Sequence, residues 1–282
     1  MTTARAEPEE IDAATPRALI VSLFGLYARE RAGWLSIATI VRLMGDLGVD
    51  EQATRSAVFR LKKRGWLEPQ KEGRVAGYRA SAEALAILEE GDDRIYGRRR
   101  ATADEGWVLV VFSVPESERD KRHRLRSTLT RLGLGTIGPG TWVAPANLAD
   151  AVLAALDRAG LRGFTDVFRA AHLSDADPRG TVAAWWDLEA LEATYADYLR
   201  RFSGVAARWE ADADPDEHRD RAFADYVPAI TAWRRLPYLD PGLSLAALPE
   251  QWIGLRAEEL FARFRTLLAE PAARYVRLVQ ES

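Results

Sequence analysis

Capping residues and glycines divide the first eighty positions into short segments, and this punctuation constrains the fold more than any other feature of the sequence. A side chain that can cap a helix precedes three segments, and a glycine follows each of them: Thr15 and Gly33, Ser36 and Gly48, Asp50 and Gly65. A capping oxygen accepts a hydrogen bond from the first helical turn, and glycine ends a helix without steric cost. The pattern predicts three helices, over residues 16–32, 37–47 and 51–64.

Apolar residues recur every three or four positions in each segment, which predicts one buried face per helix. The predicted buried positions are Leu19, Ile20, Leu23, Phe24 and Tyr27, then Ile37, Ile40, Val41, Met44 and Leu47, then Ala53, Thr54, Ala57, Val58 and Leu61. Trp34 and Leu35 suit a very short strand, and residues 66–79 alternate around a charged turn as a hairpin does. Helices and hairpin in this order predict a winged helix-turn-helix over residues 16–100. The acidic residues 1–15 are expected to form a disordered tail.

Charge is distributed unevenly along the chain. The net charge of the protein is −3, yet residues 16–100 carry 16 lysines and arginines against 11 acidic residues, a net charge of +5. Positive charge gathered in one segment favours a polyanionic partner. We therefore expect this segment to bind double-stranded DNA.

The third predicted helix carries the candidate DNA-binding residues. A B-DNA major groove admits one helix, whose exposed side chains reach the base edges. The candidates for base contact are Gln52, Arg55, Ser56 and Arg60, with Phe59 placed for a thymine methyl group; Lys62 and Lys63 suit phosphates, and Lys71 and Arg74 of the hairpin turn suit the backbone or the minor groove. Alternatively these are solvated charges, with the basic residues favouring a helix C-terminus. The whole combination favours DNA binding.

A second predicted domain covers residues 105–173. Apolar strand-length runs and amphipathic helical segments follow one another as strand 107–114, helix 116–132, strands 134–137 and 141–144, helix 148–161 and strand 165–173. This order is that of a ferredoxin-like βαββαβ domain. The predicted fold class of the chain is accordingly α+β.

The motifs "VFSVPE" and "GPGTWVAP" in this segment resemble the small CRISPR-associated ferredoxin-like nuclease. In that family an aspartate near the end of the first strand holds the metal, and Ser113 occupies the aligned position here. A serine does not supply the charge that a divalent cation requires. We expect no nuclease activity and no metal, and a role in pairing two subunits. The basic residues 119–126 are a solvated helix surface or an auxiliary nucleic-acid contact.

Residues 179–282 lack clear strands and are dominated by helical periodicity, which predicts a helical C-terminal domain. The prolines of residues 236–241 and 248–249 predict a rigid loop within it. Aromatic residues are frequent there, and such clusters are more often packed in a core than arranged around a ligand. The alternative is a pocket for an aromatic or acyl effector. Its candidate residues are Trp185 and Trp186, with Arg234, Arg235 and Arg256 for phosphates.

Seven motifs in one order extend over nearly the whole chain: "AGWL", "VDEQATRSAVFRLKKRGWLEP", "RIYG", "WVLVVFSVPE", "GPGTWVAP", "AWWDLEALEATYADYLRRF" and "RRLPYLDPGL". This order resembles the PaaX family of phenylacetate-degradation repressors. The resemblance implies a homodimeric repressor that leaves its operator when phenylacetyl-coenzyme A, or another acyl-CoA, binds. It also implies that the middle and C-terminal domains carry dimerisation and the effector response.

Enzymatic alternatives find little support in the sequence. The chain has no cysteine, its histidines are scattered at His123, His172 and His218, and no glycine-rich phosphate loop is present. No apolar run is long enough to span a bilayer, so we expect a cytoplasmic protein without a membrane partner or a cofactor. A DNA-binding regulator with a different ligand or none, a relic nuclease and an acyl-CoA enzyme remain as alternatives.

Overall fold

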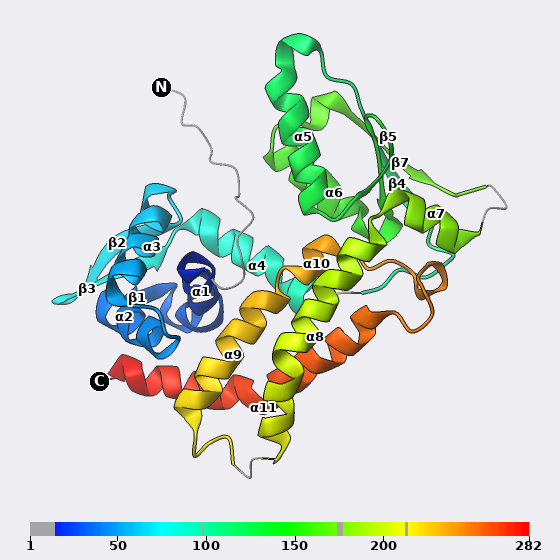
Figure 1. The fold of residues 1–282 in the computed structure, drawn as a ribbon. Coiled ribbons are helices and arrows are strands. Elements are labelled where there is room, and N and C mark those ends of the chain that lie inside the picture. Colours follow the sequence, from blue (N-terminus) through cyan, green and yellow to red (C-terminus); the bar gives the residue numbers. More distant parts are fainter. Residues whose placement is uncertain (1–14, 98, 174–176, 212–213, 282) are drawn as a thin grey trace. The chain divides into compact units, whose positions relative to one another are not determined.

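The computed structural model describes residues 15–97, 99–173, 177–211 and 214–281, and Figure 1 shows their helices and strands. Helices are combined with two antiparallel sheets, one of three strands in the order β1-β3-β2 and one of four in the order β5-β6-β4-β7. The α+β class predicted from the sequence is confirmed. Residues 1–14 of the predicted tail lie outside the described residues, and Thr15 caps the first helix.

The chain divides into two compact units. Of the described residues, the first unit combines 15–93, 198–211, 214–234 and 258–281, and the second combines 94–97, 99–173, 177–197 and 235–257. Residues of the predicted C-terminal domain therefore contribute to both units. Each predicted domain is one continuous stretch of sequence. Each observed unit instead combines stretches that are distant in the sequence.

The first unit begins with the three predicted helices. Helix α1 (Pro16–Leu23) continues as a π-helical turn, η1 (Phe24–Ala28), and a 3₁₀ turn, η2 (Arg29–Arg31). Helices α2 (Ile37–Asp46) and α3 (Glu51–Lys63) follow. The predicted caps are present, since Ser36 Oγ accepts from Thr39 N at 2.9 Å and Asp50 Oδ1 accepts from Ala53 N at 2.8 Å.

The predicted short strand and hairpin form the three-stranded sheet. Strand β1 (Trp34–Ser36) and strand β2 (Leu67–Glu72) both pair with strand β3 (Val75–Ala80). Gly77 allows β1 and β3 to approach closely, because a Cβ atom at this position would lie 2.5 Å from the Leu35 carbonyl oxygen. The hairpin is thereby anchored to the segment between the first two helices.

Helix α4 (Ala82–Tyr96) follows the sheet and was not expected from the sequence. Ser81 Oγ accepts from Ala84 N at 3.2 Å, so the helix has a capping residue that would have indicated its start. Gly91 lies inside it and is buried. An ion pair between Asp92 of α4 and Arg29 joins the helix to the end of the first helical segment.

The four-stranded sheet lies in the second unit. Its elements are β4 (Trp107–Phe112), the turn η3 (Glu116–Glu118) and α5 (Arg119–Arg131), β5 (Gly135–Gly138), β6 (Thr141–Pro145), the turn η4 (Ala146–Leu148) and α6 (Ala149–Arg158), the turn η5 (Arg162–Phe164), and β7 (Thr165–Ala170). The predicted sequence of strands and helices is thus observed. Helices α5 and α6 cover one face of the sheet (Figure 1). Leu125, Leu129, Val152 and Leu156 fill the space between helices and sheet.

The C-terminal segment is helical where it is described, as predicted. It contains α7 (Pro178–Trp185), α8 (Leu188–Ala211), α9 (Arg219–Trp233), the short α10 (Leu236–Leu239), the turn η6 (Leu245–Ala247) and α11 (Ile253–Glu281). The residues of α10 were expected to form a rigid loop rather than a helical turn. Trp209, Trp233 and Trp252 are almost completely buried, which agrees with the core interpretation of these aromatics.

Aromatic rings connect α9 to its neighbours within the first unit. Phe223 of α9 lies 6.1 Å from the ring of Tyr27 and 5.5 Å from that of Tyr275 in α11. Trp233 stacks on Phe261 at 4.5 Å. The segments at the two ends of the sequence therefore share one core.

Candidate nucleic-acid interface

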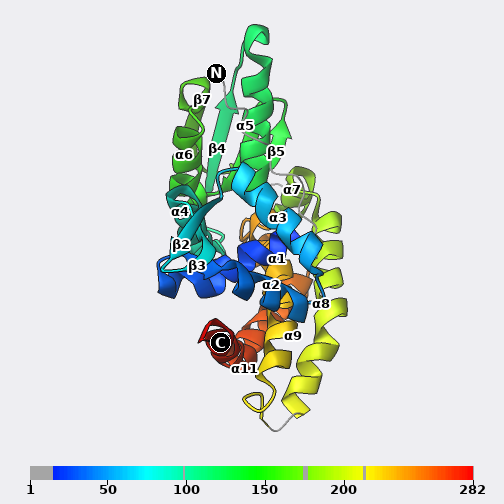
Figure 2. The ribbon, with the colours of Figure 1, turned by 90° about the vertical axis from the view of Figure 1, so that its left-hand side faces the viewer.

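Helix α3 has one buried face and one fully exposed face. Thr54, Ala57, Val58 and Leu61 are buried against α1 and α2, and Figure 2 shows α3 lying across these two helices. The predicted base-contacting residues Gln52, Arg55, Ser56 and Arg60 are all exposed on the opposite face. The packing of α3 thus brings the four side chains to one surface.

Phe59 is the clearest anomaly of this surface. It lies among the polar residues of the exposed face of α3, and its side chain is 62% exposed. Exposing a large aromatic ring to water has no benefit for folding, and such residues are enriched at binding surfaces. The position is suited to apolar contact with a base.

Arg55 is held along the helix by an ion pair. Its Nη2 lies 2.6 Å from Oε1 of Glu51, one turn earlier, and Nε donates to the same oxygen at 2.7 Å. Both side chains are 58% exposed. An exposed pair of this kind stabilises a helix by about 0.2–0.5 kcal/mol. A stronger acceptor can therefore displace Glu51 at low energetic cost.

Basic side chains continue at the end of α3 and at the hairpin turn. Lys62 and Lys63 lie in the last turn of α3 and are exposed. Lys71 and Arg74 flank the tip of the hairpin, where Glu72 pairs with Val75 across the two strands, and both are exposed. Trp34 anchors the hairpin through Nε1, which donates to the Gln70 carbonyl oxygen at 3.3 Å.

The candidate effector residues are distributed over both units. Trp185 and Trp186 lie together in the second unit, with ring centroids 6.2 Å apart, and Trp107 stands 5.3 Å from Trp185. Trp186 is buried, and its Nε1 donates to the Gly133 carbonyl oxygen at 2.8 Å.

The three arginines proposed to bind phosphates do not all lie in the same unit. Arg235 and Arg256 belong to the second unit, and Arg256 is exposed. Arg234 belongs to the first unit, where it donates to the Ala18 carbonyl oxygen at 3.2 Å. Trp185 and Trp186 are thus in contact in the second unit, whereas Arg234 belongs to the first unit.

Ser113 directly follows β4, as expected. Among the residues that the structure describes, no group of three or more histidine, cysteine or acidic side chains is arranged to hold a metal ion. Within the same residues no helix is both long enough and apolar enough to cross a bilayer.

Three family models match the chain in order. One described as a PaaX-like protein matches residues 15–84, one described as the central Cas2-like domain of the PaaX protein matches residues 100–182, and one described as the C-terminal domain of PaaX-like proteins matches residues 186–278. The chain belongs to the PaaX family. The resemblance inferred from the seven motifs is confirmed.

A curated relative supports the same assignment. The transcriptional repressor PaaX of Escherichia coli strain K12 is 27% identical over 261 residues, which are 92% of this chain and 82% of that protein. The PaaX family is one of regulators rather than enzymes, and the prediction that this chain is not an enzyme is confirmed.

A solved structure shares the fold. The uncharacterized protein Rv0674 from Mycobacterium tuberculosis matches with a TM-score of 0.55 and 20% sequence identity, over 94% of this chain and the whole of that protein. At this identity the likeness concerns the fold alone.

Proposed function

We propose that this PaaX-family protein is a sequence-specific DNA-binding transcriptional repressor of a catabolic operon. The observation that carries the proposal is the exposed face of α3, where Gln52, Arg55, Ser56 and Arg60 surround the exposed ring of Phe59. In this proposal α2 and α3 with the β2–β3 hairpin act as a winged helix-turn-helix. The repressor name of the Escherichia coli relative supports it.

The proposed reading of DNA follows from side-chain chemistry. Helix α3 enters the major groove, where Arg55 exchanges Glu51 for the O6 and N7 acceptors of a guanine and Gln52 pairs with an adenine. Lys62 and Lys63 at the helix end contact phosphates. Lys71 and Arg74 place the hairpin on the backbone or in the adjacent minor groove, which fixes the register of α3 without reading bases.

The middle segment is proposed as a ferredoxin-like domain that joins two copies of the chain. Leu109 of β4 pairs with Phe168 of β7, and these two residues share with Val111 the sheet face that is turned away from α5 and α6. Phe168 is 53% exposed and Val111 is 38% exposed. An apolar strip on a sheet face is suited to burial against its own copy in a symmetric dimer. We keep residues 16–100, 105–173 and 179–282 as the proposed domains.

The proposed effector is an acyl-CoA, with phenylacetyl-CoA as the first candidate on the basis of the family. Trp185 and Trp186 would contact the acyl group, and Arg234, Arg235 and Arg256 are the candidates for the phosphates. The effector would release the operator by binding the DNA-incompetent dimer more tightly than the competent one. A protein that acts on the genome in this way works in the cytoplasm.

A mobility-shift assay tests the proposal. The full-length protein is titrated onto the DNA upstream of its own gene and onto random DNA of equal length, with and without phenylacetyl-CoA and a panel of other acyl-CoAs. We expect preference for the upstream DNA and its loss with one acyl-CoA. Equal affinity for both DNAs would refute sequence-specific repression, and binding that no acyl-CoA changes would refute acyl-CoA release.

The variant Arg55→Ala tests the reading helix directly. Loss of a bidentate base contact should weaken binding to the preferred DNA by about 1–3 kcal/mol and leave binding to random DNA nearly unchanged. Arg162→Ala, which removes an exposed arginine of the second unit, serves as the matched control and should change neither. Equal losses on the preferred and random DNA would contradict base reading by Arg55.

A further inference from the structure

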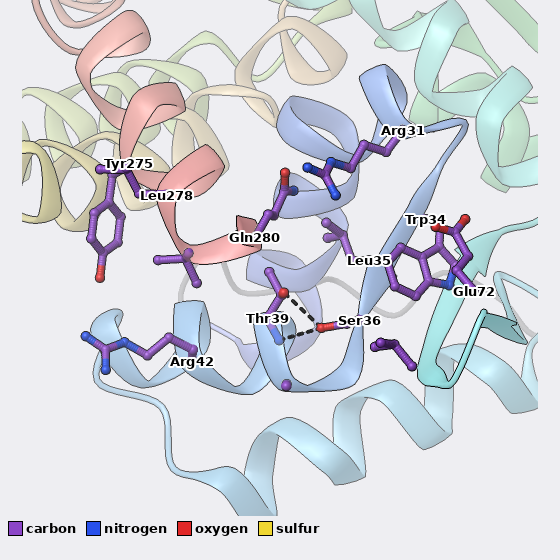
Figure 3. A pocket seen from close by; sticks show the side chains of 13 residues that line it. Arg31, Trp34, Leu35, Ser36, Thr39, Arg42, Glu72, Tyr275, Leu278 and Gln280 are labelled. Atoms are coloured by element: carbon purple, nitrogen blue, oxygen red, sulfur yellow. Dashed lines mark hydrogen bonds between the residues drawn. The ribbon is translucent and has the colours of Figure 1, made fainter. Parts of the chain in front are cut away.

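A groove with a volume of about 820 Å³ lies in the first unit, apart from the exposed face of α3. Three parts of the chain form it: strand β1 with the start of α2, the hairpin next to its tip, and the last turns of α11, as Figure 3 shows. Its volume falls within the range of about 300–1,000 Å³ that is usual for small-molecule sites. The lining residues used below are Arg31, Trp34, Glu72, Val75, Leu278 and Gln280.

One part of the groove is apolar. Trp34 forms a wall of it, and Val75, which also lines the groove, is 51% exposed. Leu278 is 50% exposed and lies beside Tyr275, on the other side of the groove from Trp34 (Figure 3). Aliphatic side chains left half exposed inside a concave surface lose hydrophobic stabilisation that a bound hydrocarbon would restore. The groove is therefore suited to a ligand with an apolar body.

The other part of the groove is suited to one negative charge. In Figure 3 the side chains of Arg31 and Gln280 point toward one another. Within the part of the chain that the structure describes, no hydrogen bond or ion pair engages the Arg31 guanidinium, and Nε2 of Gln280 is buried without a hydrogen-bond partner. A buried N–H group without a partner is energetically costly, so an acceptor placed there would gain affinity.

The remaining charges of the groove are matched by their neighbours. Glu72 is paired with Arg79 at 3.5 Å, and Arg42 with Asp46 at 3.4 Å. Tyr275 donates its hydroxyl to Asp46 at 2.7 Å, and burial is the main cause that raises the pKa of this tyrosine, so it remains a neutral donor. After these pairs, Arg31 supplies the cationic group that is open to a ligand.

We propose that this groove binds a small amphipathic monocarboxylic acid, of the aryl-alkanoic or medium-chain alkanoic class. The carboxylate accepts hydrogen bonds from Arg31 and from Nε2 of Gln280, and the hydrocarbon part lies against Trp34 and Val75. The Arg31 guanidinium is matched to the one negative charge of a carboxylate. A cationic ligand is disfavoured because it would face Arg31.

Such a ligand would contact elements of the proposed DNA-binding module. The groove is built from α2 and the hairpin on one side and from the end of α11 on the other. An occupant that bridges them changes the relative free energies of hairpin positions, and hence the affinity for DNA. This second step rests on the proposed function, whereas the binding step does not.

Calorimetric titration of the full-length protein tests the binding step. The probes are 3-phenylpropanoate and octanoate, each compared with its neutral amide. We expect both acids to bind and each amide to bind at least tenfold more weakly, since the amide lacks the charge that Arg31 recognises. Absence of binding by both acids, or equal affinity of acid and amide, would overturn the proposal.

Variants place the ligand in the groove. Arg31→Gln should weaken acid binding at least tenfold and leave amide binding unchanged, and Val75→Asp should weaken both. Arg277→Gln is the matched control, because Arg277 lies in α11, pairs with Glu270 at 2.8 Å and does not line the groove. Unchanged acid affinity in both groove variants, or the same loss in the control, would overturn the assignment of the site.

A DNA titration in the presence of saturating acid tests the second step. We expect the affinity for the preferred DNA to change at least threefold, and the change to disappear in Arg31→Gln. Bound acid without any effect on DNA affinity would overturn the regulatory step and leave the site in place. A protein that prefers no DNA sequence would refute the proposed function, and the calorimetric result would still decide whether the site exists.

Discussion

Asp240 is a completely buried carboxylate in the second unit, and its contacts explain its position. It accepts hydrogen bonds from the Tyr195 hydroxyl at 2.8 Å and from Gly242 N at 2.9 Å, and it pairs with Arg100 at 3.3 Å. Ala101 N donates to the Gly242 carbonyl oxygen at 2.8 Å, so the segment that follows α4 is fixed to the same loop. A buried charge is tolerated when it has this many partners.

Asp240→Ala should lower the free energy of unfolding by about 3–5 kcal/mol, because it leaves the Tyr195 hydroxyl and the mostly buried Arg100 without their common partner. Urea unfolding followed by circular dichroism measures the change. Asp93→Ala, at an exposed position, is the control and should stay within about 0.5 kcal/mol of the parent protein. A loss of similar size in both variants would contradict a specific role of the Asp240 contacts.

The stability of helix α3 depends on its first turn. Asp50 caps the helix by accepting from Ala53 N, and the cap directly precedes the exposed residues Gln52 and Arg55. Fraying of this turn would let those side chains lose their common orientation. Stability of the cap and affinity for DNA should therefore be coupled.

Removal of the cap by Asp50→Ala should cost about 1 kcal/mol of stability and should also weaken binding to the preferred DNA. Asp50→Asn retains a capping oxygen and should keep most of the stability and most of the affinity for the preferred DNA. Thermal unfolding and fluorescence anisotropy on the same samples measure the two effects. Weakened DNA binding in Asp50→Asn as large as in Asp50→Ala would point to the charge of Asp50 rather than to its cap.

The β2–β3 hairpin would contribute to DNA binding through the positive charges at its turn. If Lys71 and Arg74 contact phosphates, each releases counterions from the DNA on binding. Replacing both with glutamine should reduce the slope of log affinity against log salt concentration by about 0.9 for each lost contact. Titrations at several salt concentrations measure the slope. An unchanged slope would show that the hairpin turn does not touch the DNA backbone.

At the scale of the whole molecule, the N-terminal helices share their core with the C-terminal segment. Thr231 of α9 donates its hydroxyl to Ser22 of α1 at 2.7 Å, and both side chains are buried. Phe223 is completely buried between rings from η1 and α11. The core of the N-terminal helices is thus completed by residues that lie more than a hundred positions later in the sequence.

Phe223→Ala should cost about 3–5 kcal/mol and should speed amide hydrogen exchange in residues 16–31 as well as in α9, because both lose the same core. Leu245→Ala, at a position 46% exposed, is the control and should change neither measurement. Fast exchange confined to α9 would show that the N-terminal helices fold independently of the C-terminal segment.

Prediction from the sequence succeeded where the signal is local. Ser36 and Asp50 cap the predicted helices, and the hairpin forms around its predicted turn. The prediction missed α4, since Gly91 interrupts its pattern. Of the candidate sites, the residues of α3 share one exposed face because helical spacing alone determines this. The effector residues had no such spacing, and the structure distributes them over two units.

The amino-acid sequence by itself determined the capped N-terminal helices, the hairpin, the exposed face of α3 and the family, since these depend on periodicity, capping and motif order. The tertiary structure alone decided which distant segments share a core, and it formed the groove between α2, the hairpin and α11. The physical reason is that burial is a property of contacts between segments. No local pattern specifies which partner covers an apolar face, and more than two hundred residues separate Trp34 from Leu278.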